Sequence, residues 1–374
     1  MMSSREEWPQ RIGVMSGGGD CPGLNAVIRA VTKTAIRAHG LEVFGIEDGF
    51  LGLIENRVRP LSFDDVSNIL TLGGTILGSS NNADPTNFCV GTDEQGRPVC
   101  QDVTDRVLHH VKTRGLDAIV CIGGDGTMTG ASQLTQRGLR FIGAPKTIDN
   151  DLMYTEVTFG FHTAVETASE ALSRIRTTAA SHHRVMLVEM MGRNAGWLTL
   201  YAGIAGGADI ILIPEIPYSL DVIAERCLAR SRKDKAYTLI AVAEGAAPIG
   251  GEVVVDRVVR DSPDPVRLGG VSEVLCEQIG ARTNLESRAT ILGHVQRGGT
   301  PSPYDRILGT QFGHHAVELL MSGQYDRLVV MQEGRLTSVP LAEVAGRQRT
   351  VPADHPLVVA SRALGTTFGD DSDR

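Results

Sequence analysis

The segment GAPKTIDNDL, residues 143–152, places a cation, a hydroxyl, an amide and two carboxylates directly after an apolar run. The charged side chains are Lys146, Asp149 and Asp151, and Thr147 and Asn150 lie between them. Two neighbouring carboxylates repel each other unless a positive group lies beside them, so a plain turn does not explain this composition. Phosphoryl transfer does explain it, because one carboxylate can take the proton of an attacking hydroxyl while another helps to hold a metal ion. A calcium loop is the structural alternative, but the EF-hand spacing and its closing glutamate are absent from the sequence.

Two glycine-rich stretches have the composition of anion-binding loops. GGGDCPG begins at Gly17, and GGDGT spans residues 123–127. Glycines let backbone N–H groups approach a phosphate, and the helix expected after each loop adds the positive end of its dipole. Asp125 of the second stretch is a carboxylate of the kind that holds Mg²⁺ against phosphate oxygens. Both stretches also have a purely structural interpretation, as tight turns with Asp125 capping a helix.

The elements that must position these residues alternate between strands and helices. RIGVMS at 11–16 precedes the first glycine loop, and Leu24, Val27, Ile28 and Val31 then recur at helical spacing. Further strands are expected within LDAIVCIGG (116–124), RFIGAPKT (140–147), VMLVEMMG (185–192), ADIILIPE (208–215) and YTLIAVAEG (237–245). This alternation predicts an α/β protein with parallel sheets covered on both faces, in which ligands bind at the carboxyl ends of the strands. Two polar stretches, GFLGLIENRVRPLS and FCVGTDEQGRPVCQDVT, are expected to be hairpins or excursions outside the sheet.

Length and charge restrict the class of protein. A chain of 374 residues fits two domains, and the formal net charge of -8 without a basic stripe argues against nucleic acid or an anionic membrane as a partner. The start of the chain resembles no signal or transit peptide, and the most apolar segment is interrupted by Asp209 and closed by Glu215. We therefore expect a cytoplasmic protein.

Cysteine and histidine do not indicate a metal or disulfide framework. The six cysteines form no C-x-x-C pair and no regular spacing, so we expect free thiols in a reducing compartment. The sequence also contains the pairs His109–His110, His182–His183 and His314–His315. Adjacent side chains diverge on a helix or strand, which argues against a shared zinc ion.

Seven motifs in order resemble the phosphofructokinase family over residues 11 to about 335. They are GGGDCPGLN, GGDGT, PKTIDND, MGRNAGW, AEG, and the run ESRATILGHVQRGGTPSPYDR, which holds the last two. The resemblance implies transfer of a phosphoryl group to the 1-hydroxyl of fructose 6-phosphate, with Mg²⁺ as cofactor. It also implies two doubly wound αβα domains with the site in the cleft between them. We expect the donor domain to comprise residues 11–160 and 297–345, and the sugar-phosphate domain residues 161–296 and 346–374.

The family's functional residues are carried over to matching positions. Asp149 matches the general base, and Thr147 lies beside the transferred group. Lys146 directly precedes TIDND, and Asp125 matches the carboxylate on the magnesium side. The donor phosphates are expected at Gly18, Gly19, Asn81, Gly124, Gly126 and Thr127. The sugar phosphate is expected at Thr147, Asp149, Asp151, Met191, Gly192, Arg193, Glu244, His294 and Arg297, with Arg184 and Arg288 arriving from a neighbouring subunit. The resemblance thereby implies a homo-oligomer, either a dimer or a tetramer.

Three positions leave the donor and the acceptor open. In the family, the residues at positions 126 and 146 separate ATP users from pyrophosphate users. Gly126 leaves room for the α-phosphate of ATP, whereas Lys146 could neutralise a pyrophosphate leaving group; we favour ATP because steric exclusion is the stronger constraint. Asn81 stands where the family usually has arginine, which weakens charge stabilisation in the transition state. A pyrophosphate-dependent reversible enzyme, a different acceptor such as sedoheptulose 7-phosphate, and a non-catalytic regulatory subunit therefore remain alternatives.

Overall fold

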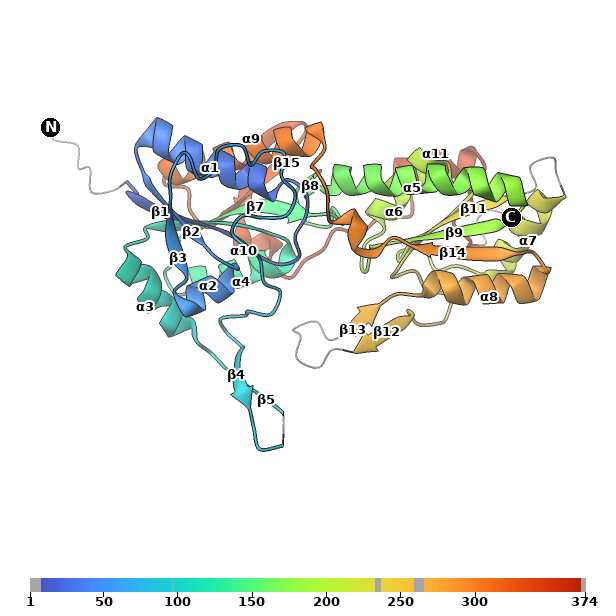
Figure 1. The fold of residues 1–374 in the computed structure, drawn as a ribbon, viewed down its shortest axis with the longest axis horizontal. Coiled ribbons are helices and arrows are strands. Elements are labelled where there is room, and N and C mark those ends of the chain that lie inside the picture. Colours follow the sequence, from blue (N-terminus) through green and yellow to red (C-terminus); the bar gives the residue numbers. More distant parts are fainter. Residues whose placement is uncertain (1–7, 96, 233–236, 259–265, 371–374) are drawn as a thin grey trace.

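The computed structural model describes residues 8–95, 97–232, 237–258 and 266–370. The chain forms two lobes, each built around its own β-sheet, and α5 (Phe161–His182) begins where the lobes meet (Figure 1). None of the described helices is long and apolar enough to cross a bilayer.

The first lobe contains an eight-stranded sheet. Its main path runs in the order β16-β15-β7-β6-β1-β2-β3, and β8 pairs with β7. The inner pairings are parallel, whereas β3 and β16 add antiparallel edges. The strands are β1 (Arg11–Ser16), β2 (Glu42–Ile46), β3 (Val58–Leu61), β6 (Ala118–Gly123), β7 (Phe141–Thr147), β8 (Phe159–Gly160), β15 (Arg327–Gln332) and β16 (Arg335–Pro340).

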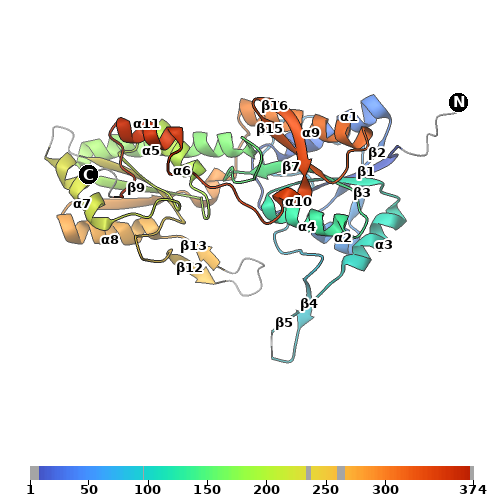
Figure 2. The ribbon, with the colours of Figure 1, turned by 180° about the vertical axis from the view of Figure 1, so that it is seen from behind.

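Helices cover both faces of this first sheet (Figures 1 and 2). One face carries α1 (Leu24–His39) and α9 (Pro303–Met321), which pack against each other. The opposite face carries α2 (Phe50–Glu55), α3 (Thr104–Arg114), α4 (Asp125–Thr135) and α10 (Leu341–Val344).

The second lobe contains a four-stranded parallel sheet in the order β10-β11-β9-β14. Its strands are β9 (Val185–Met190), β10 (Ile210–Leu212), β11 (Thr238–Ala243) and β14 (Ser287–Ile291). On one side lie α5, α6 (Trp197–Gly206) and α11 (Pro356–Ala363), and on the other α7 (Leu220–Ser231) and α8 (Val271–Thr283) (Figure 1). A ribbon of β12 (Val255–Val258) and β13 (Val266–Leu268) projects from this lobe, and the short 3-10 helix η2 (Gly293–Gln296) follows β14.

The buried strands explain this architecture. Every residue of β6, β9 and β11 is buried, as expected for strands that are covered by helices on both faces. The helix-side core is continuous across the two lobes, because Val14 and Ile142 belong to the same apolar cluster as Trp197 and Ile211. The expected fold class, two doubly wound αβα units, is confirmed, and each of the strands predicted from an apolar run lies within its stretch.

One of the two polar stretches was interpreted wrongly. Residues 50–61 were expected outside the sheet, but they form α2 and β3, and β3 pairs with β2 as the edge strand of the first sheet. Only Leu61 of β3 is buried, so an edge strand with little buried surface looked like a polar excursion. The second stretch does form a hairpin, β4 (Phe88–Thr92) with β5 (Pro98–Gln101), which projects from the first lobe.

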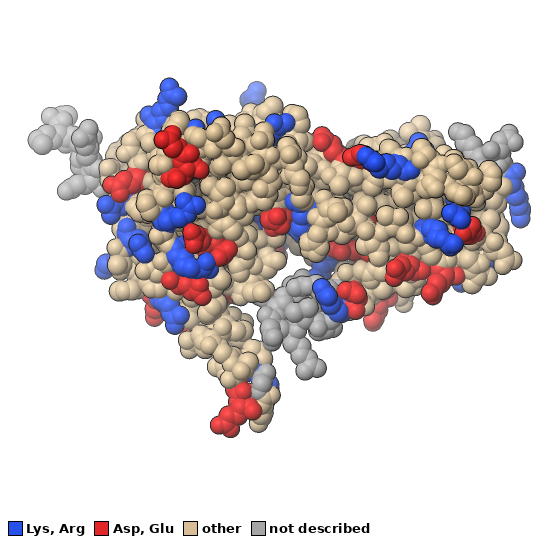
Figure 3. Space-filling model, in the orientation of Figure 1, with Lys and Arg blue, Asp and Glu red and all other residues tan. Residues whose placement is uncertain are grey.

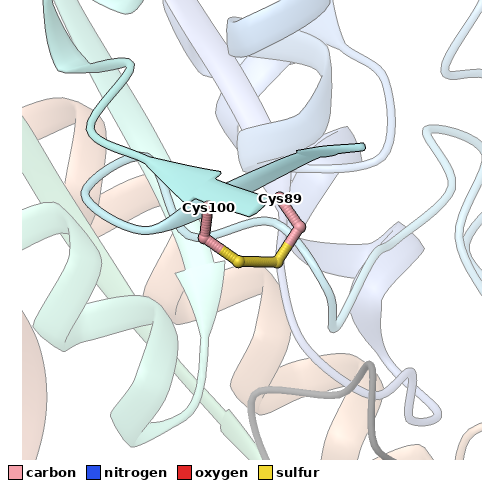
Figure 4. Close-up of a disulfide and its surroundings, with 2 residues drawn as sticks. All are labelled: Cys89 and Cys100. Atoms are coloured by element: carbon pink, nitrogen blue, oxygen red, sulfur yellow. A yellow bond between two sulfur atoms is a disulfide. The ribbon is translucent and has the colours of Figure 1, made fainter. Parts of the chain in front are cut away.

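The prediction that all cysteines are free thiols is also wrong. Cys89 of β4 and Cys100 of β5 are paired residues in the hairpin, with Cα atoms 3.8 Å apart, and their sulfurs form a disulfide (Figure 4). Antiparallel register brought them together, and an eleven-residue separation in sequence did not reveal it. Cys21, Cys121 and Cys227 are free and buried, and Cys276 is free and partly buried.

Candidate active site

The loop after β7 is held in a tight conformation by its own polar side chains. The Asp149 N–H donates to Thr147 Oγ1 at 3.0 Å. Asn150 has a positive φ of 52°, and its side chain accepts from the Thr158 N–H at 3.0 Å and donates to the Glu156 carbonyl at 3.2 Å. Asparagine tolerates this left-handed conformation better than most residues. The amide in the cluster therefore shapes the loop that carries the two carboxylates.

Asp149 is a buried acid with a strongly raised pKa. Its Oδ1 is buried without a hydrogen-bond partner. Burial and, next, the charge of Asp151 raise the pKa of Asp149 to about 7, against the opposing charges of Arg297 and Lys146. A carboxylate with a pKa near neutral and a free oxygen has the properties of a general base.

Asp125 and Asp151 form the carboxylate pair that fits a metal ion. Burial raises the pKa of Asp151, a hydrogen bond from Thr147 lowers it, and the charge of Asp125 raises it again. The pKa of Asp125 is itself raised by burial. Mg²⁺ usually takes one or two protein carboxylates and completes its shell with water and substrate phosphates. The pair therefore fits magnesium, although the described ranges contain no group of three His, Cys, Asp or Glu side chains arranged for a metal.

Lys146 connects the acidic loop with the first glycine loop. Its Nζ donates to the Gly19 carbonyl, and a Cβ added to Gly18 would lie 3.4 Å from the same nitrogen. The side chain is 4% exposed, and burial lowers the pKa of Lys146 to about 8. The ammonium thus lies against the loop that was predicted to bind donor phosphates.

The second glycine loop borders the same region. Gly124 is the N-cap of α4, and a Cβ there would lie 3.3 Å from the Lys146 carbonyl. Thr127 packs against Gly17, so the two glycine loops are neighbours. A Cβ at Gly126 would meet no atom within 4 Å, which leaves open space beside the N-terminus of α4.

Residues of the second lobe complete the cluster. Glu244 follows β11 and influences the pKa of Asp149. Burial raises the pKa of Glu244, and a hydrogen bond from the Gly192 backbone lowers it. The Arg297 guanidinium donates to the Asp20 carbonyl at 3.1 Å and acts electrostatically on both Asp149 and Glu244.

Met191, Gly192 and Arg193 form the turn after β9, and Arg193 donates to the Val266 carbonyl at 3.1 Å. Acidic and basic groups from both lobes thus converge on Asp149.

Four predicted residues show no described contact with this cluster. Arg184 and Arg288 both pair with Glu286, at 2.8 and 2.6 Å, at the start of β9 and β14. The carboxyl ends of these strands carry the cluster, so the two arginines lie at the opposite end of the second sheet. His294 is an exposed residue of η2. Asn81 is exposed and follows Ser80, whose carbonyl accepts from the Gly18 N–H at 3.3 Å.

Sequence reasoning missed a segment near the carboxyl end of the chain. The Gly346 N–H donates to Asp125 Oδ1 at 2.9 Å, and the Arg349 N–H donates to the Asp151 carbonyl at 2.7 Å. These contacts use backbone groups about 200 positions away along the chain from their partners, so no local motif could have indicated them.

Charged side chains of both signs are interspersed on the face drawn in Figure 3. Lysine and arginine lie among aspartate and glutamate there, and no broad basic area is visible on that face.

The fold and the carboxylate cluster beside two glycine loops define an α/β protein that handles phosphate groups. The profile of the family "Phosphofructokinase" matches residues 11–320, and the chain belongs to that family. It is 50% identical to the ATP-dependent 6-phosphofructokinase 2 of Clostridium perfringens, over 96% of this chain and 99% of the relative. It is 48% identical to the pyrophosphate–fructose 6-phosphate 1-phosphotransferase of Amycolatopsis methanolica, over 92% of this chain and 97% of the relative.

A solved relative has the same fold. The phosphofructokinase of Pichia pastoris in the T-state superposes with a TM-score of 0.74 at 33% identity. The superposition covers 92% of this chain and 36% of the Pichia chain, so the chain spans about a third of that relative.

Proposed function

We propose that the protein phosphorylates fructose 6-phosphate at its 1-hydroxyl with Mg-ATP, giving fructose 1,6-bisphosphate and ADP. The observation that carries the proposal is the buried, unpartnered oxygen of Asp149. This carboxyl has a pKa of about 7 and interacts electrostatically with Lys146, which lies against the first glycine loop, and with Glu244 of the other lobe. Family membership and the names of the relatives support the same reaction.

Each part of the cluster has a task in this proposal. Asp149 takes the proton of the sugar hydroxyl, whose oxygen bonds to the γ-phosphorus while the bond from phosphorus to the ADP oxygen breaks. Lys146 and Thr147 stabilise charge on the transferred group. A magnesium ion held by Asp125 and Asp151 would supply positive charge beside the donor phosphates.

The remaining predicted residues bind the two substrates. The donor phosphates lie along Gly18, Gly19, Gly124, Gly126 and Thr127, with Asn81 at the edge of the loop. The sugar phosphate contacts Met191, Gly192, Arg193, Glu244, His294 and Arg297. The donor domain then comprises residues 11–160 and 297–345, and the sugar-phosphate domain comprises 161–296 and 346–374. Residues 96, 233–236, 259–265 and 371–374 of these ranges lie outside the described residues.

The protein acts as a homo-oligomer, a dimer or a tetramer, in the cytoplasm. Arg184 and Arg288 share Glu286 at the end of the second sheet opposite the cluster. Their distance from the cluster of their own chain supports the proposal that this arginine pair binds the 6-phosphate in a neighbouring copy.

Pyrophosphate is the second candidate donor, because Lys146 is buried against the donor loop and could neutralise a pyrophosphate leaving group. The test is an assay of purified protein with Mg-ATP and with Mg-pyrophosphate, each against fructose 6-phosphate and sedoheptulose 7-phosphate. Turnover of fructose 6-phosphate with ATP is the expected result. Turnover with pyrophosphate alone would replace the donor, preference for the heptulose would replace the acceptor, and no turnover with any pair would leave the regulatory-subunit alternative.

A further inference from the structure

The chain crosses from the first lobe to the second between α10 and α11. Residues 346–351, which we call the strap, lie outside the residues 11–320 that the family profile matches. In Figure 2 the chain is seen to leave α10 and run toward α11 on the other lobe. The contacts of the strap with each lobe show which parts of the two lobes it can connect.

The first half of the strap is bonded to the acidic cluster. Gly346 donates to Asp125 Oδ1 at 2.9 Å, Arg349 donates its backbone N–H to the Asp151 carbonyl at 2.7 Å, and Gln348 forms an antiparallel bridge with Leu152. The strap therefore contacts the side chain of Asp125 and the backbone of Asp151, the two residues proposed to hold the metal.

The Arg349 side chain extends this attachment to the base itself. Its Nη2 donates to the Asn150 carbonyl at 2.8 Å and to the Glu156 carbonyl at 3.2 Å. Asn150 directly follows Asp149 and has a positive φ, so its carbonyl direction is coupled to the placement of the base. Leaving the Asn150 carbonyl buried without its charged donor costs free energy, so we expect the loop that carries Asp149 to relax when Arg349 is removed.

The second half of the strap is bonded to the start of α6. The Arg349 carbonyl accepts from Trp197 Nε1 at 2.9 Å, and its guanidinium lies 4.5 Å from the centre of the indole ring. Val351 donates to Glu215 at 2.8 Å, and the same carboxylate accepts from the Gly196 N–H at 2.9 and 3.1 Å. Gly196 is the N-cap of α6 and closes the turn that begins at Met191.

We propose that Arg349 is a positioning residue, which ties the backbone around Asp149 to the α6 terminus and so fixes the base relative to the sugar-binding turn. The inference rests on the proposed function. It predicts a loss of turnover when the tie is removed, because a displacement of the base by about 1 Å can cost roughly 100-fold in rate.

The test compares Arg349→Met and Arg349→Lys with Arg176→Met in the full-length protein. Arg176 also donates to backbone carbonyls, of Gly206 and Gly207, but in a part of the second lobe that holds no proposed site residue. We expect Arg349→Met to lower kcat by roughly 10- to 100-fold with the KM for fructose 6-phosphate within about 3-fold. Lysine should restore part of the loss, and Arg176→Met should retain the wild-type kcat.

The split between kcat and KM separates positioning from general destabilisation. A displaced base lowers kcat and leaves the sugar-binding residues in place, whereas a general loss of folded protein would lower the apparent kcat of Arg349→Met and Arg176→Met alike. A wild-type kcat in Arg349→Met would overturn the inference. Equal losses in Arg349→Met and Arg176→Met would overturn it as well.

Two further variants keep the test decisive. If Arg349→Met does not fold, Trp197→Phe removes the indole N–H bond to the strap and keeps a ring beneath the guanidinium. Wild-type kcat in both Trp197→Phe and Arg349→Lys would then refute the tie.

If the wild type is inactive with every donor, the proposed function fails, and the tie is measured by tryptophan fluorescence instead. Trp8 and Trp197 are the tryptophans of the chain, so a Trp8→Phe background isolates Trp197. Its emission should shift to the red in Arg349→Met, and an unchanged spectrum would contradict the contact.

Discussion

The acidic limb of the pH profile is the sharpest consequence of the site. Asp149 must be ionised to accept a proton, and its pKa is raised to about 7, first by burial and next by the charge of Asp151. The pKa of a general base in the free enzyme determines where kcat/KM begins to fall as the pH is lowered.

The expected magnitude follows from that pKa. Below pH 7 the ionised fraction of Asp149 falls about tenfold per pH unit, so kcat/KM at pH 6 should be roughly a tenth of its plateau. At pH 8 about nine-tenths of the Asp149 carboxyls are ionised, so the acidic limb is complete just above neutral. An unperturbed aspartate would instead give a flat profile throughout this range.

Asp151→Asn tests the cause of the shift. It removes the negative charge beside Asp149, so the limb should move to lower pH, but not to the position of an exposed aspartate because burial remains the larger cause. Glu170→Gln is the matched control, since it removes one charge from an exposed pair on α5. The assay is kcat/KM for fructose 6-phosphate from pH 5.5 to 8.5 at constant ionic strength. A profile without a limb, or a limb that moves equally in both variants, would show that Asp149 and Asp151 do not titrate as argued.

Three further predictions concern two single substitutions and one double substitution. Asp149→Asn should lower kcat by roughly 10²- to 10⁴-fold. It should also stabilise the fold by about 1–3 kcal/mol at pH 8 and not at pH 4. A carboxyl with a raised pKa makes the folded protein less stable as the pH rises from the pKa of the unfolded chain to that of the folded one. Denaturant unfolding at the two pH values measures this difference. Gly126→Asp should raise the KM for ATP at least about tenfold and leave pyrophosphate kinetics unchanged, because a Cβ at this position has no protein atom within 4 Å, whereas the added carboxylate would repel the α-phosphate. An equal effect on both donors would contradict that geometry. Cys89→Ser combined with Cys100→Ser should leave kcat unchanged and shift the midpoint of thermal unfolding by no more than a few degrees, because the hairpin projects from the lobe. Alkylation of the unreduced, denatured wild type should label four thiols, and labelling of six would exclude the disulfide.

The sequence allowed the sheet core and the position of the motifs at strand ends to be predicted, because both follow from local patterns. RIGVMS coincides with β1, and the motif at Lys146 lies at the end of β7 as expected. Parallel strands bring their carboxyl ends to one edge of a sheet, so glycine and acidic clusters that follow different strands had to lie near each other. The predicted grouping of Asp149 with Lys146 is present in the structure.

The parts that could not be predicted depend on pairing between distant or weakly patterned segments. β3 has one buried residue, and an edge strand with so little apolar surface carries no clear period. The Cys89–Cys100 bond depends on hairpin register. The strap is bonded mainly through backbone N–H and carbonyl groups, which every residue other than proline offers, so its sequence contains no signal for its partners.

Lys146 and Asp149 together explain why such a costly cluster is useful. In the free protein the pKa of Lys146 is about 8 and that of Asp149 about 7, so both groups titrate close to neutral pH. Burial disfavours the charged form of each, and an anion on the adjacent glycine loop favours protonated Lys146. A protonated Lys146 in turn favours ionised Asp149, because its charge lowers the pKa of that carboxyl. In the proposed mechanism, binding of the donor thus prepares the base, and a substrate that supplies the missing partner offsets the cost of burying these charges in the free protein.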